Sequence, residues 1–173
     1  MTAMTSVDIV GVFLDIDAGS SVVLLGDGDR PARVLPIMVG LAEADAIARA
    51  AAGVVPPRPG THDLIVALLD LLDAQLEEVA ITELRDGTFY AELFVESASG
   101  LEAIDARPSD GLALAVRAGA PIVVTTALFD EAAVPVGQKT DEPLTNTEVD
   151  EIVSDFRKFL GSVSPADFSN GRT

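Results

Sequence analysis

The feature that most constrains the fold is a run of three strand-like segments that leads directly into a helix. Tight turns separate the three segments, which cover residues 75–84, 88–96 and 101–106. The first turn carries the Asp86-Gly87 pair that is typical of a β-hairpin. The middle segment alternates apolar and polar side chains, as a strand with one buried face requires. We therefore expect an antiparallel meander of three strands.

The helix that follows this meander starts with the residues Arg107, Pro108, Ser109 and Asp110. Proline suits the first turn of a helix, and Ser109 and Asp110 can accept hydrogen bonds from the free amides there. Residues 58–63 form a similar start, with an arginine, a proline, a hydroxyl and an aspartate in the same order. An arginine beside a helix N-terminus can hold an anion. Ordinary helix capping explains both sequences equally well.

The remaining periodicity predicts an α+β fold. We expect a mixed, mainly antiparallel sheet with helices packed against it, plus an appended C-terminal helix. Further strands are expected at residues 7–16, 22–25, 32–39 and 121–125, and helices at 40–52, 61–73, 108–118, 126–133 and 145–160. A composition change near residue 135 divides the chain into a domain (1–135), a linker (136–144) and a C-terminal amphipathic helix with its tail (145–173).

Two of the expected helices have apolar stripes that need a partner surface. In the helix at 61–73 the stripe is predicted to face inward and consists of Leu64, Leu68, Leu71 and Leu72. In the C-terminal helix it consists of Val149, Ile152, Val153, Phe156 and Leu160. Because an isolated helix of this length is marginally stable, the second stripe must dock somewhere. Docking on the same chain and docking on a protein partner both remain open.

The charge of the chain argues against a broad nucleic-acid surface. The formal net charge is −17, and residues 1–137 contain 21 acidic residues against seven arginines. A protein that follows a nucleic-acid backbone needs a basic face, which this composition cannot build. Binding of a phosphate would require a local cluster of arginines or a bridging metal ion. Most of the acidity is explained by a solubilising surface.

Composition also limits the compartment and the chemistry. No apolar run approaches the roughly 18 uncharged residues that cross a bilayer. Residues 1–6 lack the basic and apolar blocks of a signal peptide. The chain has no cysteine, so disulfide and thiolate chemistry are absent. We expect a cytoplasmic protein with no membrane association.

Four segments of the chain resemble the bifunctional nuclease domain family, in order and in spacing. They lie within residues 35–48, 56–64, 84–91 and 104–110, and the resemblance extends over about residues 7–135. Residues 156–168 are similar to the C-terminal extension of bacterial members. Two glycines depart from the family pattern, since Gly60 and Gly111 stand where a bulkier residue or alanine is more usual.

The resemblance implies an α+β domain that self-associates, with a homodimer expected, and a nuclease activity on DNA and RNA. It implies no catalytic set, so the site is predicted from the residues. His62, as a group that titrates near neutral pH, is the expected general base. The other expected catalytic residues are Asp63, Asp105 and Asp110. The expected phosphate ligands are Arg58, Arg107, Ser109 and Thr61.

Phosphodiester hydrolysis commonly uses a divalent cation held by carboxylates. We expect Mg²⁺ or Mn²⁺ on Asp105 and Asp110, with Asp63 as a third candidate ligand and Glu43, Asp86 and Glu92 behind them. Two alternatives compete with the nuclease. In one, the chain is a non-catalytic oligomeric module that binds a protein partner through its terminal helix. In the other, the two helix starts bind a small anion.

Overall fold

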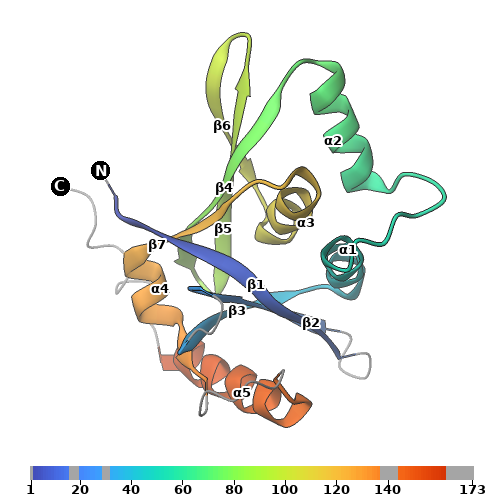
Figure 1. Ribbon diagram of the computed structural model, residues 1–173. Coiled ribbons are helices and arrows are strands. Elements are labelled where there is room, and N and C mark those ends of the chain that lie inside the picture. The colour runs from blue at the N-terminus through green and yellow to red at the C-terminus, as the bar shows by residue number, and fades with distance from the viewer. Residues whose placement is uncertain (1, 16–19, 29–31, 137–143, 163–173) are drawn as a thin grey trace.

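The computed structural model describes residues 2–15, 20–28, 32–136 and 144–162, which form one mixed sheet with helices on both of its faces (Figure 1). The strands follow the order β6-β5-β4-β7-β1-β2-β3-β8, and only the β4–β7 pair is parallel. Their bounds are β1 Met4–Asp15, β2 Ser20–Gly26, β3 Arg33–Val39, β4 Gln75–Arg85, β5 Thr88–Ser97, β6 Gly100–Ala106, β7 Ile122–Thr125 and β8 Val134–Pro135.

Five helices in the described residues pack against this sheet. They are α1 Leu41–Ala51, α2 Thr61–Leu71, α3 Pro108–Ala118, α4 Thr126–Ala132 and α5 Asn146–Ser162. The predicted α+β class, the antiparallel meander and the C-terminal helix are confirmed. No helix of the described residues is long and apolar enough to cross a membrane. The predicted linker and tail fall largely on residues 137–143 and 163–173, outside the described residues.

Strand β1 joins the two halves of the sheet. Its first part, Met4–Val7, pairs with β7, and its second part, Asp8–Asp15, pairs with β2. The register of the β1–β2 pairing shifts between Ile9 and Gly11, shortly after the pairing with β7 ends at Val7. One strand therefore connects the β4–β5–β6 meander to the β1–β2–β3 hairpins.

Helices cover both faces of the β1–β2–β3 half. In Figure 1, α1 lies on one side of these strands and α5 on the other. The sequence of β2 reflects this, because the four consecutive residues Val22–Leu25 are all buried. A strand with both faces covered is apolar throughout, whereas a half-buried strand alternates.

Helix α3 is the central helix of the layer and contacts both α1 and α2 as well as β4 and β5. Seven of its eleven residues are buried. Gly111 lets it lie close to the sheet, since a Cβ there would stand 2.7 Å from Val79 Cγ1 and 3.4 Å from Leu93 Cδ2. The absent side chain therefore sets the spacing between the helix and the sheet.

The inward orientation predicted for the leucine stripe of α2 is wrong. Leu64, Leu68, Leu71 and Leu72 are 54%, 46%, 76% and 70% exposed. The helix instead turns Ile65, Val66 and Leu69 toward the core, and none of its eleven residues is fully buried. Apolar residues surround so much of this helix that periodicity alone did not identify the covered side.

Helix α5 docks on its own chain, which answers one question that the sequence left open. Val149, Ile152 and Phe156 are buried, and Phe156 stacks on Phe89 of β5 with ring centroids 6.0 Å apart. The side chain of Leu160 lies outside the described residues. The helix begins with a capping box, in which Glu148 Oε2 accepts from the Thr145 backbone N–H at 2.7 Å.

Gly111→Ala should destabilise the protein, although alanine is about 1 kcal/mol more favourable than glycine inside a helix. Val79 is fully buried and β-branched, so it cannot move away from the new methyl group. Overpacking of this kind costs about 1–3 kcal/mol. Urea unfolding should show a lower midpoint for Gly111→Ala.

The control for this prediction is Gly111→Ala made in a protein that already carries Val79→Ala. Space is then available, so the added methyl group should cost nothing or stabilise the protein, giving a clear coupling between the two sites. Equal effects of Gly111→Ala in both backgrounds would contradict the close approach of helix and sheet.

Candidate functional site

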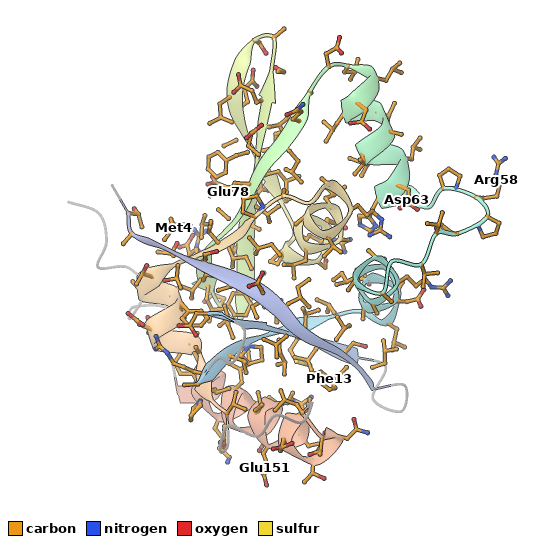
Figure 2. All side chains as sticks on the ribbon, in the orientation of Figure 1. Met4, Phe13, Arg58, Asp63, Glu78 and Glu151 are labelled. Atoms are coloured by element: carbon orange, nitrogen blue, oxygen red, sulfur yellow. The ribbon has the colours of Figure 1, made fainter. Side chains whose placement is uncertain are left out.

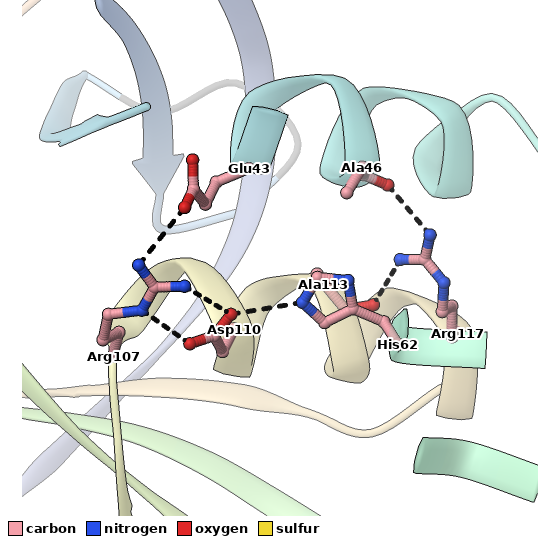
Figure 3. A network of polar contacts seen from close by, with 7 residues as sticks. All are labelled: Glu43, Ala46, His62, Arg107, Asp110, Ala113 and Arg117. Atoms are coloured by element: carbon pink, nitrogen blue, oxygen red, sulfur yellow. Dashed lines mark hydrogen bonds and ion pairs between the residues drawn. The ribbon is translucent and has the colours of Figure 1, made fainter. Parts of the chain in front are cut away.

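The starts of α2 and α3 meet in space, which brings the two arginine-proline sequences together. His62 Nε2 lies 3.2 Å from Asp110 Oδ1, and the imidazole is largely buried, with 14% of the side chain exposed (Figure 3). The contact follows from the packing of α2 against α3, since each residue stands in the first turn of its helix. A carboxylate and an imidazole are thus paired at the junction of two helix N-termini.

Asp110 is held from its other side by Arg107. Arg107 Nε donates to Asp110 Oδ2 at 2.7 Å and Nη2 donates to Oδ1 at 3.1 Å, which is a bidentate contact. The remaining Arg107 nitrogen, Nη1, donates to Glu43 Oε1 of α1 at 3.2 Å. A continuous polar chain therefore runs from α1 through α3 to α2 (Figure 3).

Arg117 makes a second set of contacts that the sequence analysis missed. Its Nε donates to Asp63 Oδ1 at 2.6 Å, and its other nitrogens donate to the carbonyl oxygens of Ala113 at 2.8 Å and Ala46 at 3.1 Å. This guanidinium connects all three helices. A sequence signal existed, because residue 117 lies two helical turns after Asp110 and so on the same face of α3.

The helix starts differ in detail from ordinary side-chain caps. Gly60, not Thr61, is the N-cap of α2, and its N–H donates to Asp63 Oδ2 at 2.8 Å. The N-cap of α3 is Arg107, with no side-chain cap hydrogen bond. Asp63 therefore caps α2 and also accepts from Arg117, whereas Asp110 accepts from Arg107.

These partners keep both aspartates ionised. The hydrogen bond from Arg107 is the main cause that lowers the pKa of Asp110, although partial burial opposes it. The hydrogen bond from Arg117 is the main cause that lowers the pKa of Asp63, with the Gly60 N–H next. Each carboxylate is therefore an acceptor over a wide range of pH.

An open hollow of about 520 Å³ lies over this network. Four arginines line it, out of seven in residues 1–137: Arg49, Arg58, Arg107 and Arg117. Within the described residues Arg58 makes no ion pair, and Figure 2 shows it at the outer end of the loop between α1 and α2. Thr61 also lines the hollow and is exposed.

A second hollow of about 510 Å³ adjoins the first and shares Glu43 and Arg107 with it. Its walls include Phe89 and the buried Phe156, so the C-terminal helix contributes to it. Ser109, predicted as a phosphate ligand, lines this second hollow and is 8% exposed. One hollow is thus rich in charge and its neighbour has aromatic walls.

The comparisons with known proteins identify the family. The family model described as the bifunctional nuclease domain matches residues 23–137. The chain belongs to the bifunctional nuclease domain family. It is also 42% identical, over 167 residues, to the uncharacterized proteins MT1877 and Rv1829 from two strains of Mycobacterium tuberculosis. The match covers 95% of this chain and 98% of each relative.

One expected site residue of this bifunctional nuclease domain lies elsewhere. Asp105 is exposed on β6 opposite Glu92 of β5. Its neighbour Ile104 pairs with Leu93, which faces α3, so strand alternation directs Asp105 to the other face of the sheet. Asp86 occupies the hairpin turn with a positive φ of 51°. None of these three carboxylates lines either hollow.

The donor set expected for a divalent cation in this family member does not fit one ion. Asp105 and Asp110 belong to different faces of the sheet, and Asp110, Asp63 and Glu43 are each engaged by an arginine. Among the described residues no group of three or more His, Cys, Asp or Glu side chains is placed to hold a metal ion.

Acid should weaken this site through Asp110. Because its pKa is lowered in the folded chain, its contribution to stability is present above the unfolded value of about 3.9 and is lost as pH falls through the folded value. Urea unfolding between pH 6 and pH 2 should show a smaller loss of stability for Asp110→Asn than for the unchanged protein.

Asp70→Asn is the matched control for this measurement. Asp70 is exposed on α2 and has no ion pair among the described residues, so its removal should leave the acid-dependent loss nearly unchanged. Identical acid profiles for Asp110→Asn and the unchanged protein would show that the Arg107 contact does not contribute to stability.

Proposed function

We propose that the arginine-rich hollow binds a phosphodiester and that His62 acts as the general base of its hydrolysis. The observation that carries the proposal is the His62–Asp110 pair, set at the edge of a hollow that contains four of the seven arginines in residues 1–137. Membership in the bifunctional nuclease domain family supports the reaction class.

The protonation of His62 follows from its partner. Asp110 is ionised and can only accept, so Nε2 of His62 carries the hydrogen in the neutral imidazole. The lone pair then resides on Nδ1, which can take a proton from a water molecule. Asp110 fixes the ring and stabilises its positive charge, as the carboxylate does in histidine-based hydrolases.

The reaction has a simple balance of atoms. The oxygen of water attacks phosphorus while its proton passes to Nδ1 of His62, and the P–O bond to one ester oxygen breaks. That oxygen leaves as an alcohol when the imidazolium of His62 returns the proton to it, directly or through water, and the imidazole is then neutral again. Charge develops on the non-bridging phosphate oxygens in the transition state, which is where a guanidinium contributes most.

Arg58 is the arginine best suited to contact the phosphate. Arg107 and Arg117 are occupied by carboxylates and act as positioning residues, and Arg49 pairs with Asp45 at 2.8 Å. Arg58 has no such partner in the described part of the chain, and the exposed hydroxyl of Thr61 lies on the same wall. A planar guanidinium recognises phosphate oxygens bidentately.

The charge distribution limits the substrate to a short one. Glu43, Asp45, Asp63 and Asp110 line the same hollow as the four arginines, so the site itself is close to neutral. A chain of net charge −17 repels a long polyanion outside the hollow. We therefore propose nucleotides or short oligonucleotides as ligands, with the aromatic walls of the second hollow available to the base or sugar.

Loss of the base should abolish turnover while leaving the fold intact. His62→Gln should reduce kcat for cleavage of a short labelled DNA or RNA by roughly 100-fold or more. Arg58→Ala should mainly raise KM, because it removes a phosphate contact. Cleavage is followed by gel, with and without EDTA, on proteins purified side by side.

Arg85→Ala is the control, because Arg85 is exposed, pairs with Glu83 and lines neither hollow. It should cleave like the unchanged protein. Unaltered cleavage by His62→Gln would assign the activity to a contaminant or another site. If calorimetry shows that a nucleotide binds and no cleavage is detected, the small-anion module is favoured over the nuclease.

A further inference from the structure

The second hollow contains two polar groups that the proposed phosphate site does not use. Ser109 is 8% exposed, yet its hydroxyl makes no hydrogen bond among the described residues. Glu43 Oε1 accepts from Arg107, whereas Oε2 has no hydrogen-bond partner in the same part of the chain (Figure 3). Both side chains line the hollow. Because polar groups that are largely buried normally have partners, these two leave hydrogen bonds available to a ligand.

The free oxygen of Glu43 has a defined position. A Cβ at residue 40 would collide with Glu43 Oε2, so the carboxylate lies close to the backbone at the start of its own helix. Gly40 is the N-cap of α1 and has ordinary extended angles, with φ −71° and ψ 162°. Glycine is therefore needed there for space. Arg107 holds the other oxygen at 3.2 Å, which fixes the carboxylate from its second side.

The rest of the second hollow is mainly apolar. Its walls include Ile37, Met38 and Val39 of β3, Phe89 of β5 and Phe156 of α5. Phe89, Phe156 and Phe159 form a ladder of stacked rings with centroids 6.0 Å apart, and Phe89 is an end member of this ladder. A flat ring that contacts Phe89 would extend the stack. Apolar walls with few polar groups suit a heterocycle, and the free carboxylate oxygen disfavours a second phosphate.

The unpaired groups distinguish among the nucleobases by hydrogen-bond direction. A carboxylate oxygen can only accept, while a hydroxyl both donates and accepts. Guanine presents two neighbouring N–H donors, at N1 and at the 2-amino group, beside the carbonyl oxygen O6. Adenine has a lone pair on N1 at the corresponding position, and a carboxylate repels it. Guanine is therefore the base whose donor edge best matches Glu43.

We propose that the second hollow is a base-binding subsite that selects guanine. Glu43 Oε2 accepts from N1 and the 2-amino group, and the Ser109 hydroxyl donates to O6. This inference rests on the proposed function, because the phosphate of the same nucleotide lies in the first hollow beside Arg58. Glu43 and Arg107 line both hollows, so they stand between the two ends of the nucleotide. The substrate class is then a short nucleic acid that is cleaved next to guanine.

Calorimetry on the unchanged protein tests the selectivity. GMP should bind roughly tenfold or more tightly than AMP, which is the discrimination expected from paired hydrogen bonds to a base edge. Inosine monophosphate keeps N1–H and O6 but lacks the 2-amino group, so its affinity should lie between the two. Guanosine should bind more tightly than adenosine although neither has a phosphate. Equal affinities for GMP and AMP would overturn the inference.

Glu43→Gln changes the direction of one hydrogen bond and keeps the shape of the side chain. Arg107 needs an acceptor, so the amide should turn its oxygen to Arg107 and its NH₂ group to the hollow. The preference for GMP over AMP should then disappear, because the NH₂ group can donate to N1 of adenine. A preference for GMP that survives in Glu43→Gln would overturn the assignment.

Glu83→Gln is the matched control for this variant. Glu83 also accepts from an arginine, Arg85, but it lines neither hollow, so its change should leave the selectivity as it is. Ser109→Ala should weaken GMP binding about fivefold, as the loss of one hydrogen bond does. Ser99→Ala removes a serine hydroxyl outside both hollows and should have no effect. Unaltered GMP binding by Ser109→Ala would contradict its role.

Cleavage measurements separate the failure of this inference from the failure of the proposed function. For short oligonucleotides, kcat/KM should be roughly tenfold or more higher beside guanine than beside adenine. Cleavage that does not depend on the base would overturn the subsite and leave the nuclease standing. Guanine-selective binding without cleavage would do the reverse. Absence of binding by GMP, AMP and guanosine alike would overturn both.

Discussion

The close approach of α3 to the sheet is the constraint on which the site depends. Gly111 lets the helix lie against Val79 and Leu93, and this places α3 where α1 and α2 can both contact it. Arg107, Asp110 and Arg117 all belong to this helix or its cap. Their bonds to neighbouring helices exist because the spacing of α3 is fixed by the backbone rather than by a flexible side chain.

The polar network has the character of a preorganised site rather than a charged surface. In a strongly acidic chain, four arginines gather in one hollow, and three of them are held by carboxylates. Their geometry is therefore set before any ligand arrives, which reduces the entropy lost on binding. Selectivity for a ligand would then come from shape and hydrogen-bond direction, with little long-range attraction.

Much of the fold could be predicted because its signals are local. Alternation in residues 88–96 and the Asp86-Gly87 turn identify the meander, and Thr145 with Glu148 identifies the start of α5. The proximity of residues 58–63 to residues 107–110 was a hypothesis that no local signal could establish. It depends on the packing of α2 against α3, which is a tertiary contact.

Three features of the sequence were harder to interpret for physical reasons. The leucine periodicity of α2 shows that a face is apolar but does not show what covers it. Asp105 stands near the arginine-proline sequence in the chain, yet strand alternation turns it to the opposite face of the sheet. Arg117 was missed because its three acceptors come from three separate helices.

Strand β1 lies outside the segment that matches the family, although the sheet needs this strand to be continuous. The family match begins at residue 23, inside β2, and ends at residue 137, before α5. A fragment with those ends would lack the strand between β7 and β2, so its two half-sheets would share no hydrogen-bonded edge. It would also lack Phe156 of α5, whose ring stacks on Phe89. The segment recognised as a domain by similarity is therefore completed, as a cooperative structure, by residues on both sides of it.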